Sequence, residues 1–163
     1  MILGIAGNMN YLIVKFNYSK KIIQKVKKIK GSYFNSDIVS WEIPNSIYSV
    51  DRIFKIFKDD DIFLNKSLKE NTKLSLSPSI KLLFRRYYVK KMRKALLLRG
   101  YSKKTIRVYL SHVQRFLRYH NKILNHINEN DIKEYLLYLL EVKHLSHSYT
   151  NQAISAIKFL YKV

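Results

Sequence analysis

Cysteine is absent from this chain, and glycine and proline are scarce, with 4 Gly and 2 Pro in 163 residues. Without cysteine, the protein has no disulfide framework and no thiolate metal site. The 47% of hydrophobic residues excludes a disordered basic tail and indicates folded cores. No apolar run approaches the ~20 residues that cross a bilayer, and the opening MILGIAGNM lacks the basic region of a secretion signal. We therefore expect a cytoplasmic protein.

Acidic residues are also few, since 11 Asp and Glu stand against 31 Lys and Arg, for a formal net charge of +20. A polyanion partner is the ordinary reason for a folded chain to tolerate such self-repulsion. Residues 1–80 hold 13 basic and 7 acidic residues (net +6), whereas residues 81–163 hold 18 and 4 (net +14). The acids of the second half lie in one short segment, at Glu129, Asp131, Glu134 and Glu141. This sorting predicts that the second half binds the polyanion and that its acidic helix faces away from it.

The first 64 residues alternate between strand and helix patterns. Runs rich in β-branched and aromatic residues begin at Tyr11, Tyr33, Ile38 and Ile62. Between them, two segments that start after Ser19 and Ser46 place apolar residues at helical spacing. The pattern predicts a small α+β domain over residues 1–64, with the order β-α-β-β-α-β.

The rest of the chain predicts a linker followed by helices. Residues 65–79 are polar and are interrupted by Pro78, which is typical of an interdomain linker. Residues 80–163 follow a helical period and predict an all-α bundle of four helices. Asn130 is a candidate N-cap of the third helix, and Ser146 and Ser148 are candidates for the fourth.

The stretch from Leu96 to Tyr119 predicts a helix with two distinct faces. Gly100 suits the left-handed end of the preceding helix, and Ser102 suits the N-cap of the next. One face is apolar, with Ile106, Tyr109, Leu110, Val113, Phe116 and Leu117 at steps of three and four. The other face carries five cations, one hydroxyl and no acid, at Lys104, Arg107, Ser111, Arg115, Arg118 and Lys122. Such a face can serve solubility alone, but the sorting of charge between the halves favours a binding surface.

Three ordered motifs in the second half, RGYSKKTIRVY, NDIKEYL and SYTNQAISAIKFLY, resemble the SAM-like core-binding domain of tyrosine recombinases and phage-type integrases. The resemblance covers about residues 80–163. It implies that the domain forms half of a clamp around recombination-site DNA, with its second and fourth helices against the major groove. Together with the cationic face, it assigns contacts with double-stranded DNA to Lys103, Lys104, Thr105, Arg107, Ser111, Arg115, Ser148, Thr150, Asn151, Ser155 and Lys158.

The same resemblance implies binding without catalysis. In that family the catalytic domain follows the fourth helix, where this chain ends at Val163, so we expect no enzymatic activity from it. His112 and Arg115 repeat the family's catalytic H-x-x-R pattern, but they fall in the DNA-facing helix of the other domain. His144 and His147 lack the further ligands that a metal needs. We predict no catalytic residue, metal or cofactor; the partners expected are duplex DNA and, by the resemblance, further recombinase protomers on the same site, but no membrane or small-molecule substrate.

A shorter resemblance lies in the first half, where IKGSYFNSDIVSWEIP is similar to the HARP-type module. Gly31, Tyr33, Trp41 and Pro44 carry it, and related modules precede some bacterial integrases. Trp41 also suits the core anchor of a hairpin, whether or not the resemblance holds. The alternative for the whole chain is a stand-alone adaptor that binds DNA or RNA and has no role in recombination.

Overall fold

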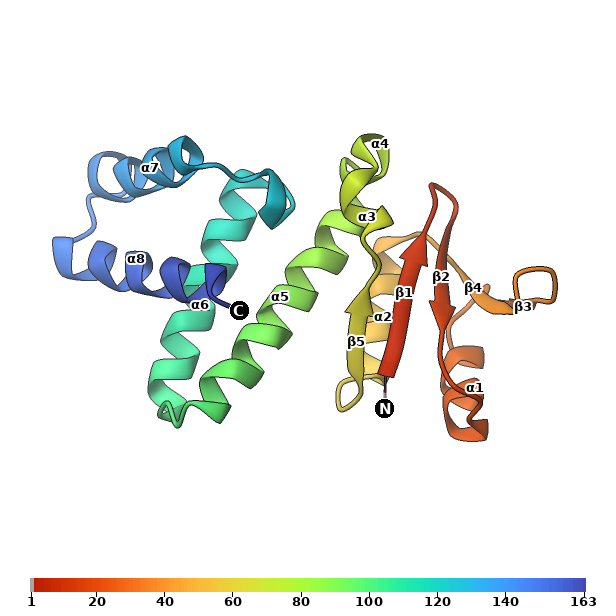
Figure 1. Ribbon diagram of the computed structural model, residues 1–163. Helices are drawn as coiled ribbons and strands as arrows, with labels where there is room; N and C mark the ends of the chain where they lie inside the picture. The colour runs from red at the N-terminus through yellow and green to blue at the C-terminus, as the bar shows by residue number, and fades with distance from the viewer. Residues whose placement is uncertain (1) are drawn as a thin grey trace. The chain divides into compact units, whose positions relative to one another are not determined.

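The computed structural model describes residues 2–163 and divides into two compact units. The first unit extends to Leu83 and the second spans Phe84–Val163, so the boundary falls within helix α5 (Pro78–Leu98) (Figure 1). Among the described residues, no helix combines the length and the apolar composition that crossing a membrane requires.

The first unit is built on a five-stranded sheet in the order β3-β4-β2-β1-β5. Its strands are β1 (Ile2–Gly7), β2 (Tyr11–Lys15), β3 (Tyr33–Asn35), β4 (Ser40–Pro44) and β5 (Asp61–Leu64). Neighbouring strands pair antiparallel, except that β1 and β5 run parallel. The predicted α+β class is confirmed, but the predicted element order was wrong because it lacked β1. This strand contains Gly4 and Gly7, and glycine is depleted in strands, so its sequence carries a weak strand signal.

Two helices, α1 (Lys20–Lys27) and α2 (Ile47–Ile56), contribute the rest of the first core. Ser19 and Ser46 cap them by accepting backbone N–H groups of the first turn. Alternate residues of β1 and β2 are 0–1% exposed, and the helices supply matching buried residues at Ile22, Val26, Val50 and Ile53. Trp41 packs edge-on against Phe34 across the β3–β4 hairpin, with ring centroids 5.8 Å apart. Trp41 is therefore the expected core anchor of the hairpin.

The segment 65–79, predicted to be a linker, contains two short helices, α3 (Ser67–Glu70) and α4 (Thr72–Ser75). Leu68 and Leu74 are at most 1% exposed, and the Ser79 hydroxyl donates a hydrogen bond to Asn45 Oδ1 at 2.5 Å. The segment therefore packs within the first unit.

The second unit consists of the rest of α5, α6 (Lys103–His120), a 3₁₀ turn η1 (Leu124–His126), α7 (Glu129–Leu137), a π-helical turn η2 (Tyr138–Val142) and α8 (His147–Tyr161). The predicted stripes of α5 and α6 are buried, including Met92, Leu96, Val113 and Phe116, except that Tyr109 is half-buried. Asn130 was the wrong N-cap for α7. Asn128 caps it instead, in a reciprocal capping box with Asp131 in which both hydrogen bonds measure 2.9 Å.

Candidate nucleic-acid interface

The corner between α5 and α6 fixes where the basic helix begins. Gly100 has a φ of +72° and its amide donates to the Leu97 carbonyl at 3.0 Å, which closes α5 in a left-handed turn. Ser102 then caps α6, because its Oγ accepts the backbone N–H of Thr105 at 3.1 Å. Both features were predicted, and they follow from residues that are close in the chain.

The predicted cationic face of α6 is exposed to solvent. Lys103, Lys104, Arg107, Arg115 and Arg118 are exposed, and Ser111 is half-buried among them. Lys122 was wrongly assigned to this face. The helix ends at His120 and Asn121 takes a left-handed φ of +48°, so Lys122 leaves the face. Its Nζ lies 2.8 Å from Asp131 Oδ1, and this ammonium group, with the Asn128 amide, lowers the pKa of that carboxyl.

The residues of α8 that were assigned contacts with DNA are exposed, except for one. Ser148, Asn151, Ser155 and Lys158 are exposed. Thr150 is 5% exposed, and its hydroxyl donates to the Ser146 carbonyl at 3.3 Å. Thr150 therefore belongs to the core side of α8, because it lies a third of a turn away from the polar row.

Helices α6 and α8 pack directly on each other. The Arg115 guanidinium donates a hydrogen bond to the Tyr149 hydroxyl. A shallow pocket of about 460 Å³ opens along the same seam and is lined by Tyr109 of α6 and by Ser148, Asn151, Gln152 and Ser155 of α8. Arg115 of α6 thus contacts α8 at Tyr149, and the hydroxyls and amides of α8 line a pocket with Tyr109 of α6.

His112 lies under this seam and is 3% exposed. Its ring packs against Tyr149 at a centroid distance of 4.6 Å. Burial lowers the pKa of His112, the charge of Arg115 lowers it further, and a hydrogen bond with Gln152 opposes the shift. A neutral, buried imidazole between two helices acts as a packing residue, which supports the structural interpretation of the H-x-x-R pattern.

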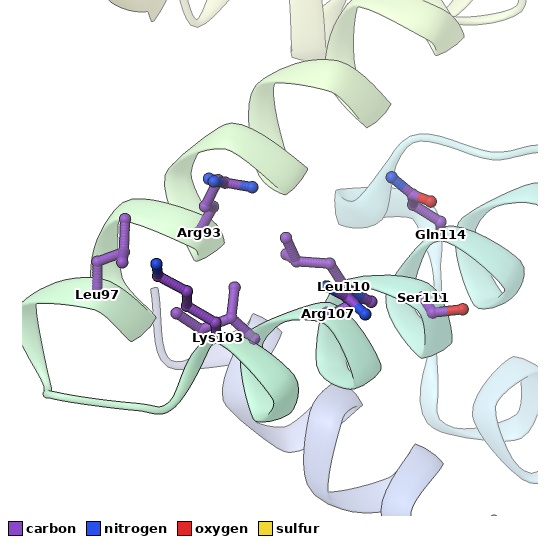
Figure 2. Close-up of a pocket in the computed structure, with 8 residues that line it drawn as sticks. Arg93, Leu97, Lys103, Arg107, Leu110, Ser111 and Gln114 are labelled. Atoms are coloured by element: carbon purple, nitrogen blue, oxygen red, sulfur yellow. The ribbon is translucent and has the colours of Figure 1, made fainter.

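A second pocket, of about 540 Å³, lies between the second half of α5 and α6 (Figure 2). Arg93 of α5 and Lys103 and Arg107 of α6 line it together with Ser111 and Gln114. Three cations and two polar side chains around one hollow, with no acid among the lining residues, suit a phosphate or another anion.

The cationic surface extends further along α5. Burial lowers the pKa of Arg85, and the neighbouring charges of Arg118 and Arg86 lower it further. Like charges held this close repel each other, so an anion bound among them relieves the repulsion. The sequences of α5, α6 and α8 contain no aspartate or glutamate, so no acid in these three helices offsets their cations.

Sequence reasoning missed three polar residues of this surface, namely Arg93, Gln114 and Gln152. Arg93 is one of several cations in α5, and helical periodicity does not show which of them faces α6. No group of three or more possible metal ligands occurs among the described residues, and both His144 and His147 are exposed.

Comparison with known families finds a match for most of the second unit. Residues 88–163 match the family described as Phage integrase, N-terminal SAM-like domain. The matched segment is a little under half of the chain and includes all of α6, α7 and α8. Neither a search of curated proteins nor a search of solved structures finds a match. The family match supports an integrase-type domain in the second unit, and such a domain implies DNA as a partner in general.

Proposed function

We propose that this protein binds duplex DNA through the adjoining faces of α6 and α8, as the DNA-binding part of a tyrosine recombinase or phage-type integrase. In this role it clamps recombination-site DNA during integration. The observation that carries the proposal is the hydrogen bond of Arg115 with Tyr149, because it joins one cation of the α6 row to α8.

We expect the cations of α6 to contact phosphates and the polar residues of α8 to contact bases. Exposed lysines and arginines bind phosphates whatever the DNA sequence. The affinity that they supply falls steeply with salt concentration. Asn151 and Ser148 are side chains that can read base edges, and both are exposed on α8. The pocket that holds Arg93 and Lys103 is the best site for a backbone phosphate next to the groove.

We infer that the chain binds DNA without cleaving it. The only H-x-x-R pattern of α6 places its histidine in the core. An assay with a suicide substrate that traps covalent protein–DNA adducts should therefore give none. We also propose that residues 1–64, with the HARP-like hairpin, form an accessory module, and that further protomers bind the same DNA site.

Charge reversal on α6 tests the proposal. Fluorescence anisotropy with a labelled duplex should show that Lys104→Glu and Arg107→Glu each weaken binding by about tenfold or more. Lys133→Glu is the matched control, because it makes the same charge change on α7, where Lys133 is 65% exposed and its ion pair with Glu129 lies on the surface. Equal losses in all three variants would show that net charge alone drives binding.

A competition series separates this function from the alternative. Duplex DNA should displace the labelled duplex more effectively than duplex RNA or single strands of equal length. If duplex RNA competes best, the chain is an RNA-binding adaptor and the recombination role is rejected.

A further inference from the structure

A third pocket in the second unit, of about 480 Å³, is walled by tyrosines and is not explained by duplex binding. Tyr119 comes from α6, Tyr135 and Tyr138 from α7 and the turn after it, and Tyr149 from α8. The rings of Tyr119 and Tyr138 lie 4.7 Å apart, and those of Tyr119 and Tyr135 lie 5.2 Å apart. The pocket therefore offers aromatic surface, which favours a flat ligand.

Three cations line the same pocket. Arg115 and Arg118 come from α6, and Lys143 follows the turn after α7. The Lys143 ammonium lies 5.6 Å from the centre of the Tyr138 ring, and the Arg115 guanidinium lies 5.9 Å from that of Tyr149. No acid lines the pocket; Glu134 lies near it and hydrogen-bonds the Tyr119 hydroxyl. The ligand that fits is therefore both flat and negatively charged.

Irregular backbone builds one wall of this pocket. The Lys143 amide donates to the Tyr138 carbonyl at 3.0 Å, which is the wide i to i+5 bond of a π turn. His144 follows with a left-handed φ of +50°, and the Leu145 amide returns to the Leu139 carbonyl at 3.0 Å. Single π turns are rare and frequent at functional sites. This turn brings Tyr138, Leu139, Lys143 and Leu145 to the same hollow.

One polar group of the wall lacks a partner. Tyr135 is 1% exposed, and its hydroxyl makes no hydrogen bond with any described residue. Burial raises the pKa of Tyr135 to about 12, so the hydroxyl is a neutral donor at physiological pH. Buried hydroxyls are ordinarily satisfied, so this donor is consistent with a ligand that supplies the acceptor.

We propose that this pocket binds a single unstacked nucleotide, with its base against Tyr119 and Tyr138 and its phosphate against Arg118 and Lys143. Stacking of bases on aromatic side chains tolerates any base, and the guanidinium and ammonium groups neutralise the phosphate. The volume lies within the range of about 300–1,000 Å³ of small-molecule sites. The nucleotide is either free in solution or an unpaired residue of a nucleic acid strand, and Arg115 joins the pocket to the proposed duplex face.

The experiment titrates the full chain with deoxyadenosine monophosphate by calorimetry. Tyr138→Ala should weaken binding by about tenfold or more, because it removes the stacking ring. Tyr138→Phe keeps the ring and should keep the affinity, which also controls for folding. Lys143→Gln should weaken binding several-fold, whereas Lys133→Gln, the same change outside the pocket, should not.

Two results overturn the proposal. One is the absence of nucleotide binding to the wild-type chain while its circular dichroism shows the folded helices. The other is competition by inorganic phosphate as strong as that by the nucleotide, since it reveals an anion site without base recognition. Binding of fully paired duplex should be the same for Tyr138→Ala and the wild type, so this pocket and the duplex face can fail separately.

A further arm assigns the source of the nucleotide. A duplex with one unpaired adenosine is compared with the fully paired duplex. If the wild-type chain prefers the former and Tyr138→Ala loses this preference, the pocket takes an extruded base. If there is no preference but the mononucleotide binds, the pocket takes the free nucleotide.

Discussion

Arg115 on α6 donates a hydrogen bond to Tyr149 on α8, and these residues are 34 positions apart in the chain. The guanidinium also lies near the face of the same ring. The contact fixes the direction of one exposed cation and joins the two helices on which the proposed DNA surface depends. Removing the hydrogen bond should change how Arg115 is positioned, whereas replacing Arg115 should also remove its charge.

Tyr149→Phe and Arg115→Gln separate these effects. Tyr149→Phe removes the acceptor but keeps the charge, so duplex affinity should fall by about two- to fivefold with the slope of log K against log salt unchanged. Arg115→Gln removes one phosphate contact, so the slope should decrease by about 1. Anisotropy titrations at several salt concentrations measure both. Identical slopes for the wild type and Arg115→Gln would exclude Arg115 from the interface.

Arg93 provides a second prediction, because it lies in the pocket between α5 and α6 and was not part of the predicted site. Arg93→Gln should lower the salt slope by about 1 and weaken duplex binding. Lys91→Gln is the control, since Lys91 is an exposed cation of the same helix that does not line the pocket. If both variants reduce the slope equally, the pocket has no special role.

Two glycines with positive φ should differ in their tolerance of alanine. Gly100→Ala should destabilise the second unit by about 1 kcal/mol, because only the left-handed conformation opposes the methyl group and no atom lies within 4 Å of it. Gly31→Ala should cost more, because the new Cβ would lie 2.8 Å from a side-chain carbon of Pro44.

Denaturant titrations can follow the two units separately. Trp41, the single tryptophan, reports on the first unit by fluorescence, and far-UV circular dichroism reports mainly on the helices. Gly31→Ala should shift the fluorescence transition and Gly100→Ala the helical one. A larger loss for Gly100→Ala would contradict the steric argument.

Two histidines, the buried His112 and the half-buried His120, predict a pH dependence of stability. Burial lowers the native pKa of both His112 and His120 below the ordinary value of 6.5. As the pH falls below about 6.5, the unfolded chain takes up protons that the native chain refuses, so the free energy of unfolding falls until the native pKa is reached. The stability that these neutral imidazoles contribute is fully present above that window.

Thermal unfolding between about pH 7.5 and pH 5 measures this effect. His112→Gln should make the loss of stability with falling pH less steep, because it removes one of the two imidazoles whose pKa is lowered. The lowered pKa of Asp131 places its own contribution at still lower pH, since it is lost only below the usual carboxylate range of about 4. An unchanged slope in His112→Gln would show that His112 is not neutral and buried in solution.

Local features were predictable from the sequence. The cap at Ser102, the left-handed turn at Gly100 and the buried stripe of α6 follow from residues within a few positions of each other. For α8 the sequence left two candidate caps, Ser146 and Ser148, and the cap is Ser146. The strand β1 was missed because its signal is weak, and its partners, β2 and β5, are what make it a strand. The cap at Asn128 was missed because two asparagines lie two residues apart and local spacing does not choose between them.

The basic and polar character of the candidate surface was also predictable, but the particular residues that form it were not. Thr150 and Lys122 are residue types that can contact DNA, but Thr150 is buried in the core and Lys122 pairs with Asp131. Arg93 and Gln152 join the surface because α5 and α8 pack against particular sides of α6. Helical periodicity defines a face of each helix, whereas the contacts between helices decide which faces meet.

The sequence alone determined the α+β and helical classes of the two halves, the basic character of the second half and the exposed cations of α6, since these depend on residue type and on spacing along one element. The tertiary structure decided that Arg115 of α6 contacts Tyr149 of α8, that His112 is buried against the same tyrosine and that four tyrosines and three cations line one pocket. Those relations depend on packing between segments distant in the chain, where burial of apolar area, and not local spacing, selects the arrangement.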